Sequence, residues 1–334
     1  MTQTYFLGAN SKDGFASLYA DFPPRPGGFL HIIKGGPGTG KSSFMRAIGK
    51  AAEARALDVH YVLCSGDPDS LDGVYIPALR SAWVDGTAPH VTEPVLFGVD
   101  SDYVNLGQFC RLPIAPADAE HIMAVSQKYK ALYQHAYAYL SAAADLERAD
   151  SRQNSPSPIL KQQVDTLLQE AAEQAAGQVE ALTPRRSSRF LHALSCRGEV
   201  RLTTEIEKLC KQIIQLDRAE ALAYAAESFP GEVILCPSPL RPELPEAVLL
   251  PEASLALVDS SWQIPAARSL TEAAPLTAEQ AEARQLKARM LALAFDRLRR
   301  AKALHDEMEA VYKRYMDFPA LTAYTDTLLN RLFS

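Results

Sequence analysis

The first part of the chain alternates short apolar runs with apolar positions at helical spacing. Residues 29–34 form an apolar run that leads directly into a glycine-rich segment, and residues 60–64 form a second run. Both have the length and composition of buried strands. Between them, one helical face carries Phe44, Ala47, Ile48, Ala51 and Ala54. Strand, loop, helix and strand make a βαβ unit, which predicts a parallel sheet covered on both faces. Residues 81–85 predict a third strand.

A heptad pattern replaces the short runs from Ile122 onward. Apolar side chains recur every three or four residues, at Ile122, Val125, Tyr129, Leu132, Ala136, Tyr139, Ala143 and Leu146. This spacing predicts a long helix. The polar segment 150–158 contains prolines and predicts a turn, and apolar positions from Leu160 to Ala171 predict a second helix. We therefore expect an antiparallel helical hairpin over residues 118–183.

The end of the chain predicts another long helix. Thr277 and Gln280 have the spacing of a capping box, in which each side chain satisfies a backbone amide of the other residue. An apolar face follows, formed by Ala301, Leu304, Met308, Val311 and Tyr315. Packing within the chain is the simplest role for these helical faces, and binding to a protein partner or self-association is the alternative.

The two halves of the sequence resemble each other in a fixed order. Residues Phe6, Leu7, Ala9, Ser11 and Gly14 return as Phe190, Leu191, Ala193, Ser195 and Gly198. Further matches join 62–64 to 234–236, 74–85 to 248–259, and 130–132 to 302–304. Constant order at a nearly constant offset predicts a duplicated chain. The expected domains are an α/β domain (1–117), the helical hairpin (118–183), a second α/β domain (184–275) and a C-terminal helical segment (276–334).

The glycine-rich segment 35–42 fits the motif GxxxxGK[ST] at the start of a helix. Glycines permit backbone angles closed to other residues and let backbone amides approach phosphate oxygens, and the helix N-terminus favours the same negative charge. Lys41 is expected to contact the β- and γ-phosphates, and the Ser42 hydroxyl to bind Mg²⁺. The sequence therefore predicts an ATP-binding P-loop NTPase domain over 1–117, with ATP and Mg²⁺ as cofactors. The predicted binding residues are Gly35, Gly36, Pro37, Gly38, Thr39, Gly40, Lys41, Ser42 and Ser43.

The matching part of the second half, residues 212–222, contains no glycine and no Gly-Lys-Ser sequence. It lacks both the amide cradle and the lysine that hold a triphosphate. The predicted fold class is thus α/β, a P-loop NTPase parallel sheet that is duplicated with a degenerate second copy, each half followed by long helices.

A carboxylate is expected to complete the magnesium site. Asp85 follows the apolar run 82–84 and is the first candidate for a Walker B aspartate, so Lys41 and Asp85 are the predicted catalytic residues. Asp67 is the second candidate, with Asp69 and Asp72 close to it in sequence. A loop or cap carboxylate is the structural alternative for each of them.

The groups that would activate water are harder to assign. Motor-type ATPases commonly place a glutamate directly after the Walker B aspartate, but Gly86 stands at that position. Glu93 and His90 are the nearest substitutes in sequence. The candidate arginine fingers are Arg25, Arg111, Arg185, Arg186 and Arg189, although clustered surface arginines are usually just solvated.

Composition adds limits rather than chemistry. The chain of 334 residues has 47% apolar and 22% charged residues, as ordinary globular proteins have. A net charge of −6 argues against broad binding to nucleic acid. Five scattered cysteines without a CxxC pair predict reduced thiols rather than a zinc site. The sequence shows no secretory signal and no apolar stretch long enough to cross a membrane, which predicts a cytoplasmic protein.

The segments 6–14, 33–43, 64–73 and 84–90 together resemble a little-characterised family of bacterial P-loop ATPases whose members look like tandem duplications. The resemblance covers most of the chain and is most specific in its first third. It implies ATP binding, a duplicated P-loop fold and an origin in spore-forming or related Firmicutes-type bacteria, without a known substrate. A second glycine loop is often present in that family, and its absence here predicts a single site.

Three functions are consistent with this sequence. The first is an ATP-binding protein with slow or partner-stimulated ATPase activity, because positioning and charge neutralisation stabilise phosphoryl transfer without an obvious base. The second is a kinase for a small molecule or nucleotide, although the expected hairpin carries only Arg148 and Arg152 for a lid. The third is a non-enzymatic sensor in which ATP fixes a conformation.

Overall fold

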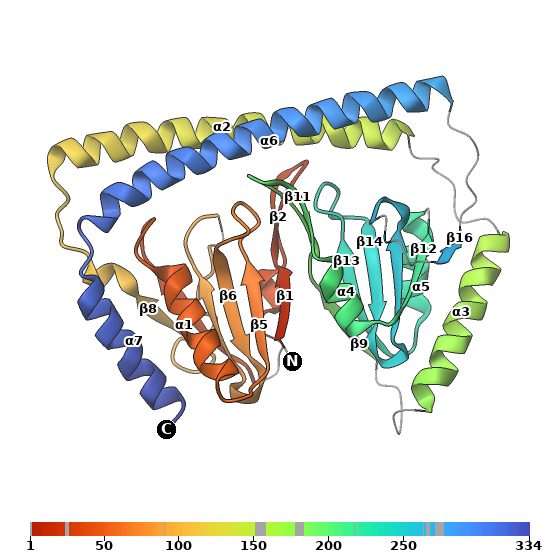
Figure 1. Ribbon diagram of the computed structural model, residues 1–334, viewed down its shortest axis with the longest axis horizontal. Coiled ribbons are helices and arrows are strands. Elements are labelled where there is room, and N and C mark those ends of the chain that lie inside the picture. The colour runs from red at the N-terminus through yellow and green to blue at the C-terminus, as the bar shows by residue number, and fades with distance from the viewer. Residues whose placement is uncertain are drawn as a thin grey trace.

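The computed structural model describes residues 2–23, 27–89, 91–150, 158–177, 184–216, 218–262, 264, 268–270 and 277–334. These residues form two six-stranded sheets, two β-hairpins, and long helices that run across both sheets (Figure 1). Short 3₁₀ turns lie at Tyr19–Asp21, Pro77–Leu79, Leu106–Phe109, Pro251–Ala253 and Ser260–Trp262. The chain is an α/β protein, as the sequence predicts.

The first sheet is mixed, not fully parallel as expected. Its strand order is β1 (Thr2–Phe6), β5 (Val59–Leu63), β6 (Leu71–Ile76), β7 (Ser81–Asp85), β4 (Phe29–Lys34) and β8 (Ser101–Asn105). Strand β6 is antiparallel to both of its neighbours, and every other pair is parallel. The connections on either side of β6 are short, whereas parallel neighbours need a long crossover. The three strands predicted at 29–34, 60–64 and 81–85 are confirmed as β4, β5 and β7.

The second sheet repeats this topology. Its order is β9 (Arg185–Ser188), β13 (Glu232–Pro237), β14 (Pro245–Leu250), β15 (Leu255–Asp259), β12 (Gln212–Leu216) and β16 (Arg268–Leu270). Strand β14 is antiparallel to its neighbours, as β6 is in the first sheet. Each half also has a hairpin, β2 (Gly8–Ser11) with β3 (Gly14–Ser17) and β10 (His192–Ser195) with β11 (Gly198–Arg201). Equal order and direction in both sheets are compatible with a duplicated α/β fold.

The helix that follows the central strand differs between the halves. In the first half, β4 ends at Lys34 and helix α1 (Lys41–Glu53) begins only after the glycine loop. Helix α1 buries Phe44, Met45 and Ile48 against the first sheet. In the second half, β12 ends at Leu216 and helix α5 (Ala219–Ser228) begins almost at once. The second half therefore has no room for a counterpart of the glycine loop. A short helix α4 (Thr203–Leu209) precedes β12.

Two long helices lie side by side over both sheets (Figure 1). They are α2 (Pro116–Asp150) and α6 (Ala278–Lys313). They run antiparallel, because Arg314 just after the end of α6 pairs with Asp118 at 2.8 Å, while Lys287 near its start pairs with Glu147. Both long helices were predicted. The capping box at Thr277 and Gln280 is confirmed in both of its hydrogen bonds.

The predicted antiparallel hairpin of residues 118–183 is wrong. Helix α3 (Pro158–Ala176) does not return along α2 but packs against the core of the second half through Leu160, Val164 and Leu167. Helix α7 (Phe318–Leu332) likewise follows α6 and packs against the first half, where Leu321 joins the core around α1. Each long helix therefore carries the chain to the other half. A heptad pattern identifies a buried helix face but not the partner that covers it.

Candidate functional site

The glycine loop lies between the carboxyl end of β4 and the first turn of α1. Gly38 and Gly40 have φ angles of 69° and 87°, a region in which only glycine avoids strain. The Lys41 ammonium donates to the backbone oxygens of Gly35 at 2.8 Å and Gly36 at 2.9 Å. The Thr39 hydroxyl donates to the same Gly36 oxygen at 2.8 Å. The loop is thus folded around the charged end of its own lysine.

Asp85 lies beside Lys41 at the carboxyl end of β7. Its Oδ2 is 3.6 Å from Lys41 Nζ, and both side chains are about nine-tenths buried, with 13% and 12% exposed. The other oxygen of Asp85 accepts hydrogen bonds from the backbone amide of Thr87 at 2.9 Å and from its hydroxyl at 2.5 Å. The two predicted catalytic residues therefore meet, since β7 is the parallel neighbour of β4. The role of Asp85 at a metal ion stays a prediction.

The second candidate carboxylate faces a different partner. Asp67 follows β5, and its Oδ2 lies 3.3 Å from Nζ of Lys302 on α6. Asp69 forms an ion pair with Arg197 of the second half. Asp72 is buried within β6, with 5% of its surface exposed. Asp67 and Asp69 therefore have partners other than Lys41, and Asp72 lies inside the sheet.

The donor set at the loop suits a magnesium ion bound together with phosphate. The described residues contain no group of three His, Cys, Asp or Glu side chains able to hold a metal alone. Mg²⁺ usually takes one or two protein oxygens and completes its coordination shell with water and phosphate. The Ser42 hydroxyl and the Asp85 carboxylate are therefore oxygen ligands of the right type and number. The Ser42 hydroxyl already accepts a hydrogen bond from the Leu71 amide at 2.9 Å, which fixes it at the start of α1.

Packing explains why no glutamate follows Asp85. A Cβ atom on Gly86 would lie 2.3 Å from Cγ2 of Ile32, closer than real contacts allow. Glu93 is held instead by Lys34 at 3.0 Å and by the Tyr103 hydroxyl, and these hydrogen bonds lower its pKa. His90 lies outside the described residues. The part of the site that the structure describes holds no carboxylate in the expected position of a water-activating base.

The candidate arginine fingers that can be placed have other partners. Arg111 donates to the backbone oxygen of Arg314 at 2.9 Å. Arg185 pairs with Glu232, Arg186 donates to the Phe229 and Gly231 oxygens, and Arg189 donates to Gln3. Arg25 lies outside the described residues. Arg111 and Arg186 thus donate to backbone oxygens, Arg185 pairs with a carboxylate on the neighbouring strand, and Arg189 joins the two halves.

The sequence did not predict that α6 and α7 cover the glycine loop. A Cβ atom on Gly38 would lie 2.8 Å from the Glu309 backbone oxygen, and one on Gly36 would lie 3.3 Å from the Tyr312 ring. On the α7 side, a Cβ atom on Gly40 would lie 3.0 Å from Leu321. The loop glycines therefore also permit close approach of helices that belong to the other end of the chain.

His305 of α6 shares the electrostatic environment of Lys41. Burial lowers its pKa most, and the positive charges of Lys302 and Lys41 lower it further, against the opposing effect of Glu309 and Asp306. Its ring also lies 6.1 Å from the ring of Tyr129 on α2. In the sequence, only the match between residues 130–132 and 302–304 involves this region. That match does not predict that His305 lies near the glycine loop.

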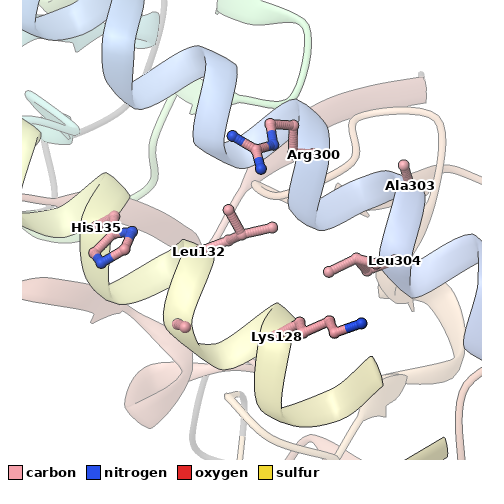
Figure 2. Close-up of a pocket in the computed structure, with 7 residues that line it drawn as sticks. Lys128, Leu132, His135, Arg300, Ala303 and Leu304 are labelled. Carbon is pink, nitrogen blue, oxygen red and sulfur yellow. The ribbon is translucent and has the colours of Figure 1, made fainter. Parts of the chain in front are cut away.

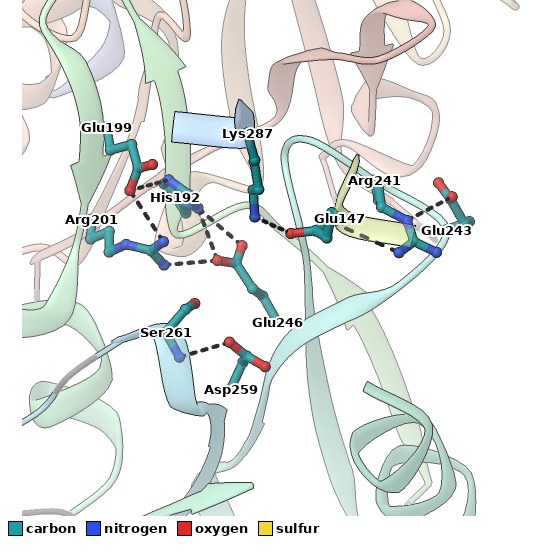
Figure 3. A network of polar contacts seen from close by, with 10 residues as sticks. All are labelled: Glu147, His192, Glu199, Arg201, Arg241, Glu243, Glu246, Asp259, Ser261 and Lys287. Atoms are coloured by element: carbon teal, nitrogen blue, oxygen red, sulfur yellow. Dashed lines mark hydrogen bonds and ion pairs between the residues drawn. The ribbon is translucent and has the colours of Figure 1, made fainter. Parts of the chain in front are cut away.

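The matching place in the second half has different chemistry (Figure 3). Asp259, the repeat match of Asp85, accepts a hydrogen bond from the Ser261 amide at 2.8 Å, and burial raises its pKa. Nearby, Glu246 contacts His192 Nδ1 at 2.9 Å and Arg201 Nη1 at 2.7 Å. Burial alone would raise the pKa of Glu246, but the contacts with His192 and Arg201 outweigh it and lower the pKa. Buried ion pairs of this kind fix side chains in place.

A shallow groove between α2 and α6 is a separate feature (Figure 2). It is lined by repeat-matched pairs, Ala131 with Ala303 and Leu132 with Leu304. The groove therefore lies where equivalent parts of the two helices face each other. Lys128, His135 and Arg300 also line it. The groove has no glycine loop and no carboxylate, and nothing in its lining identifies a ligand.

No protein-family model, no curated protein and no solved structure matches this chain. Among the described helices, none is long and apolar enough to span a bilayer. The five cysteines are free thiols, as their scattered positions predict.

Proposed function

We propose that this chain is a P-loop protein that binds ATP with Mg²⁺ and hydrolyses it slowly or when a partner stimulates it. One observation carries the proposal: Lys41 Nζ bonds to the Gly35 and Gly36 oxygens while Asp85 lies 3.6 Å away. A loop of glycines, a lysine in its centre and a carboxylate at the adjacent strand end are the parts that phosphoryl chemistry needs in one place.

The residues of the site would act mainly by position and charge. The loop amides at the start of α1 would hold phosphate oxygens, and the Lys41 ammonium would neutralise them. Ser42 and Asp85 would hold Mg²⁺, which draws negative charge from the bridging and terminal oxygens. Packing at Gly86 keeps a glutamate out of the position beside Asp85, which supports slow rather than rapid hydrolysis.

The contact between the loop and α6 favours a sensor as the second candidate function. Gly38 and Glu309 are in backbone contact, so a change in the loop would act directly on a helix that spans both halves. In a sensor of this kind, α6 relays the nucleotide state to the second half. The second sheet repeats the fold of the first but has no glycine loop of its own. The resemblance to the duplicated bacterial P-loop ATPases supports the same proposal, with the cytoplasm as the compartment and the helices as the surface for a protein partner.

Purified protein with ATP and Mg²⁺, alone and with a panel of nucleosides and nucleotides, tests this proposal. Phosphate release and product mass are measured, with Lys41→Ala as the control. Slow phosphate release that Lys41→Ala abolishes supports the ATPase. A phosphorylated acceptor would identify a kinase, and binding without turnover would identify a sensor. No binding of ATP by the wild type would refute all three.

A further inference from the structure

Helix α6 brings a positive charge from the second half to the loop that follows β5 in the first half. Lys302 lies 3.3 Å from Asp67 Oδ2 and forms a second ion pair with Asp306, one turn further along its own helix. Asp67 belongs to the loop after β5, at the same edge of the sheet where β7 ends on Asp85. The pair of Lys302 with Asp67 is therefore a contact across the two halves, at the edge where ligands bind in open α/β sheets.

Two further contacts place Lys302 on the side of α6 that faces the loop. Glu309, on the same helix, touches Gly38, and Tyr312 touches Gly36. Between Lys302 and Glu309 lies His305, whose Nδ1 is 3.6 Å from Glu309 Oε1. Burial lowers the pKa of His305 most, Glu309 opposes this shift, and the charges of Lys302 and Lys41 add to it.

The ammonium of Lys302 keeps its charge in this position. Its two partners, Asp67 and Asp306, are both carboxylates, and an ion pair with a carboxylate favours the charged form of a lysine. The side chain is 29% exposed, so it has room to change its partner. The arginines considered for this role, where the structure places them, donate to backbone oxygens or to side chains elsewhere.

We propose that Lys302 is the residue that distinguishes ATP from ADP, by giving the terminal phosphate a charged partner from the second half of the chain. The inference rests on the proposed nucleotide site. ATP carries one phosphate more than ADP, and in this proposal the additional phosphate is the group that Lys302 contacts. A charge-assisted hydrogen bond to phosphate is among the stronger polar contacts in proteins. Exchange of Asp67 for phosphate at Lys302 would also change the contact that joins α6 to the first half.

Calorimetric titration with Mg-ATP and with Mg-ADP tests the assignment in four proteins. They are the wild type, Lys302→Gln, Lys302→Arg, and Lys130→Gln, which changes the repeat-matched and exposed lysine of α2. We expect Lys302→Gln to bind ATP about tenfold more weakly while its ADP affinity changes less than about twofold. Lys302→Arg should keep most of the preference for ATP, and Lys130→Gln should behave as the wild type. Thermal melting of each variant confirms that it is folded.

Equal loss of ATP and ADP affinity in folded Lys302→Gln, or no loss of either, would overturn the role of Lys302. In both cases the binding of ATP by the wild type would leave the proposed function standing. Absence of ATP binding in the wild type would instead refute the proposed function, and the inference with it.

Discussion

Phe6 and Phe190 donate their backbone amides to each other's oxygens, and both hydrogen bonds measure 2.9 Å. The two residues are repeat matches, and both are fully buried. A reciprocal pair of this kind places the two halves about a pseudo-two-fold axis. A second pair of bonds obeys the same symmetry, from the Lys12 amide to the Leu240 oxygen and from the Cys196 amide to the Gly66 oxygen, both 3.1 Å.

The symmetry makes the difference between the halves informative. The first half has the glycine loop and the pair of Lys41 with Asp85, whereas the second has Asp259 beside Ser261 and a buried ion-pair network. Because α6 starts on the second half and ends over the loop of the first, the one proposed site is built by both halves.

Asp85→Asn is expected to weaken Mg²⁺-dependent ATP binding by roughly tenfold and to do so more than Asp67→Asn. Asp85 lies beside Lys41, while Asp67 is turned toward Lys302. Titrations with Mg²⁺ and with a chelator separate metal-dependent from metal-independent binding. A larger effect in Asp67→Asn would assign the metal carboxylate to the loop after β5 instead.

Glu246→Gln is expected to destabilise the protein by about 3–5 kcal/mol at pH 7, since it leaves the Arg201 guanidinium and the buried His192 ring without the carboxylate that they share. The matched control is Glu199→Gln, whose side chain is 41% exposed and should cost about 1 kcal/mol or less. Urea unfolding of both variants measures these free energies.

The pH dependence of the same variant follows from the sign of the pKa shift. The folded-state pKa of Glu246 is lowered, so its contribution is present above the unfolded value of 4.5 and is lost as pH falls through the folded pKa. The gap in stability between wild type and Glu246→Gln should therefore narrow in acid. A difference in unfolding free energy that stays constant from pH 7 down to strong acid would show that Glu246 does not form an ion pair as a charged carboxylate.

Gly38→Ala is expected to cost more stability than Gly98→Ala. Both glycines have positive φ angles, 69° and 76°, so an alanine at either pays about 1–2 kcal/mol of backbone strain. At Gly98 nothing lies within 4 Å of the added Cβ atom, whereas at Gly38 it meets the Glu309 backbone oxygen at 2.8 Å. The difference between their free energies of unfolding therefore reports the contact with α6, and equal costs would contradict that contact.

Local parts of the fold were predictable from the sequence. The strand at 29–34, the helix after the glycine loop and the capping box at Thr277 depend on neighbours within a few residues. The meeting of Asp85 with Lys41 also follows from local rules, because a carboxylate at the end of a neighbouring parallel strand shares the sheet edge with the loop.

Non-local parts were not predictable. The antiparallel strand β6 changes the sheet from parallel to mixed. The apolar residues of β6 do not indicate in which direction the strand runs relative to its neighbours. Helix α3 covers the second half instead of returning along α2, since periodicity shows a face and not its partner. Lys302 meets Asp67, and His305 lies within the electrostatic influence of Lys41, only because α6 crosses the molecule, which no pattern within α6 indicates.

Calorimetric titration of the wild type, Lys41→Ala and Asp259→Asn with Mg-ATP tests the central claim most directly. The expected result is one ATP per chain in the wild type and in Asp259→Asn, because Asp259 faces Ser261 and no glycine loop. Folded Lys41→Ala should bind ATP at least tenfold more weakly, since it loses a charge-assisted hydrogen bond of about 1.5–3 kcal/mol. Two sites in the wild type, or near-native affinity in folded Lys41→Ala, would contradict a single site at the glycine loop.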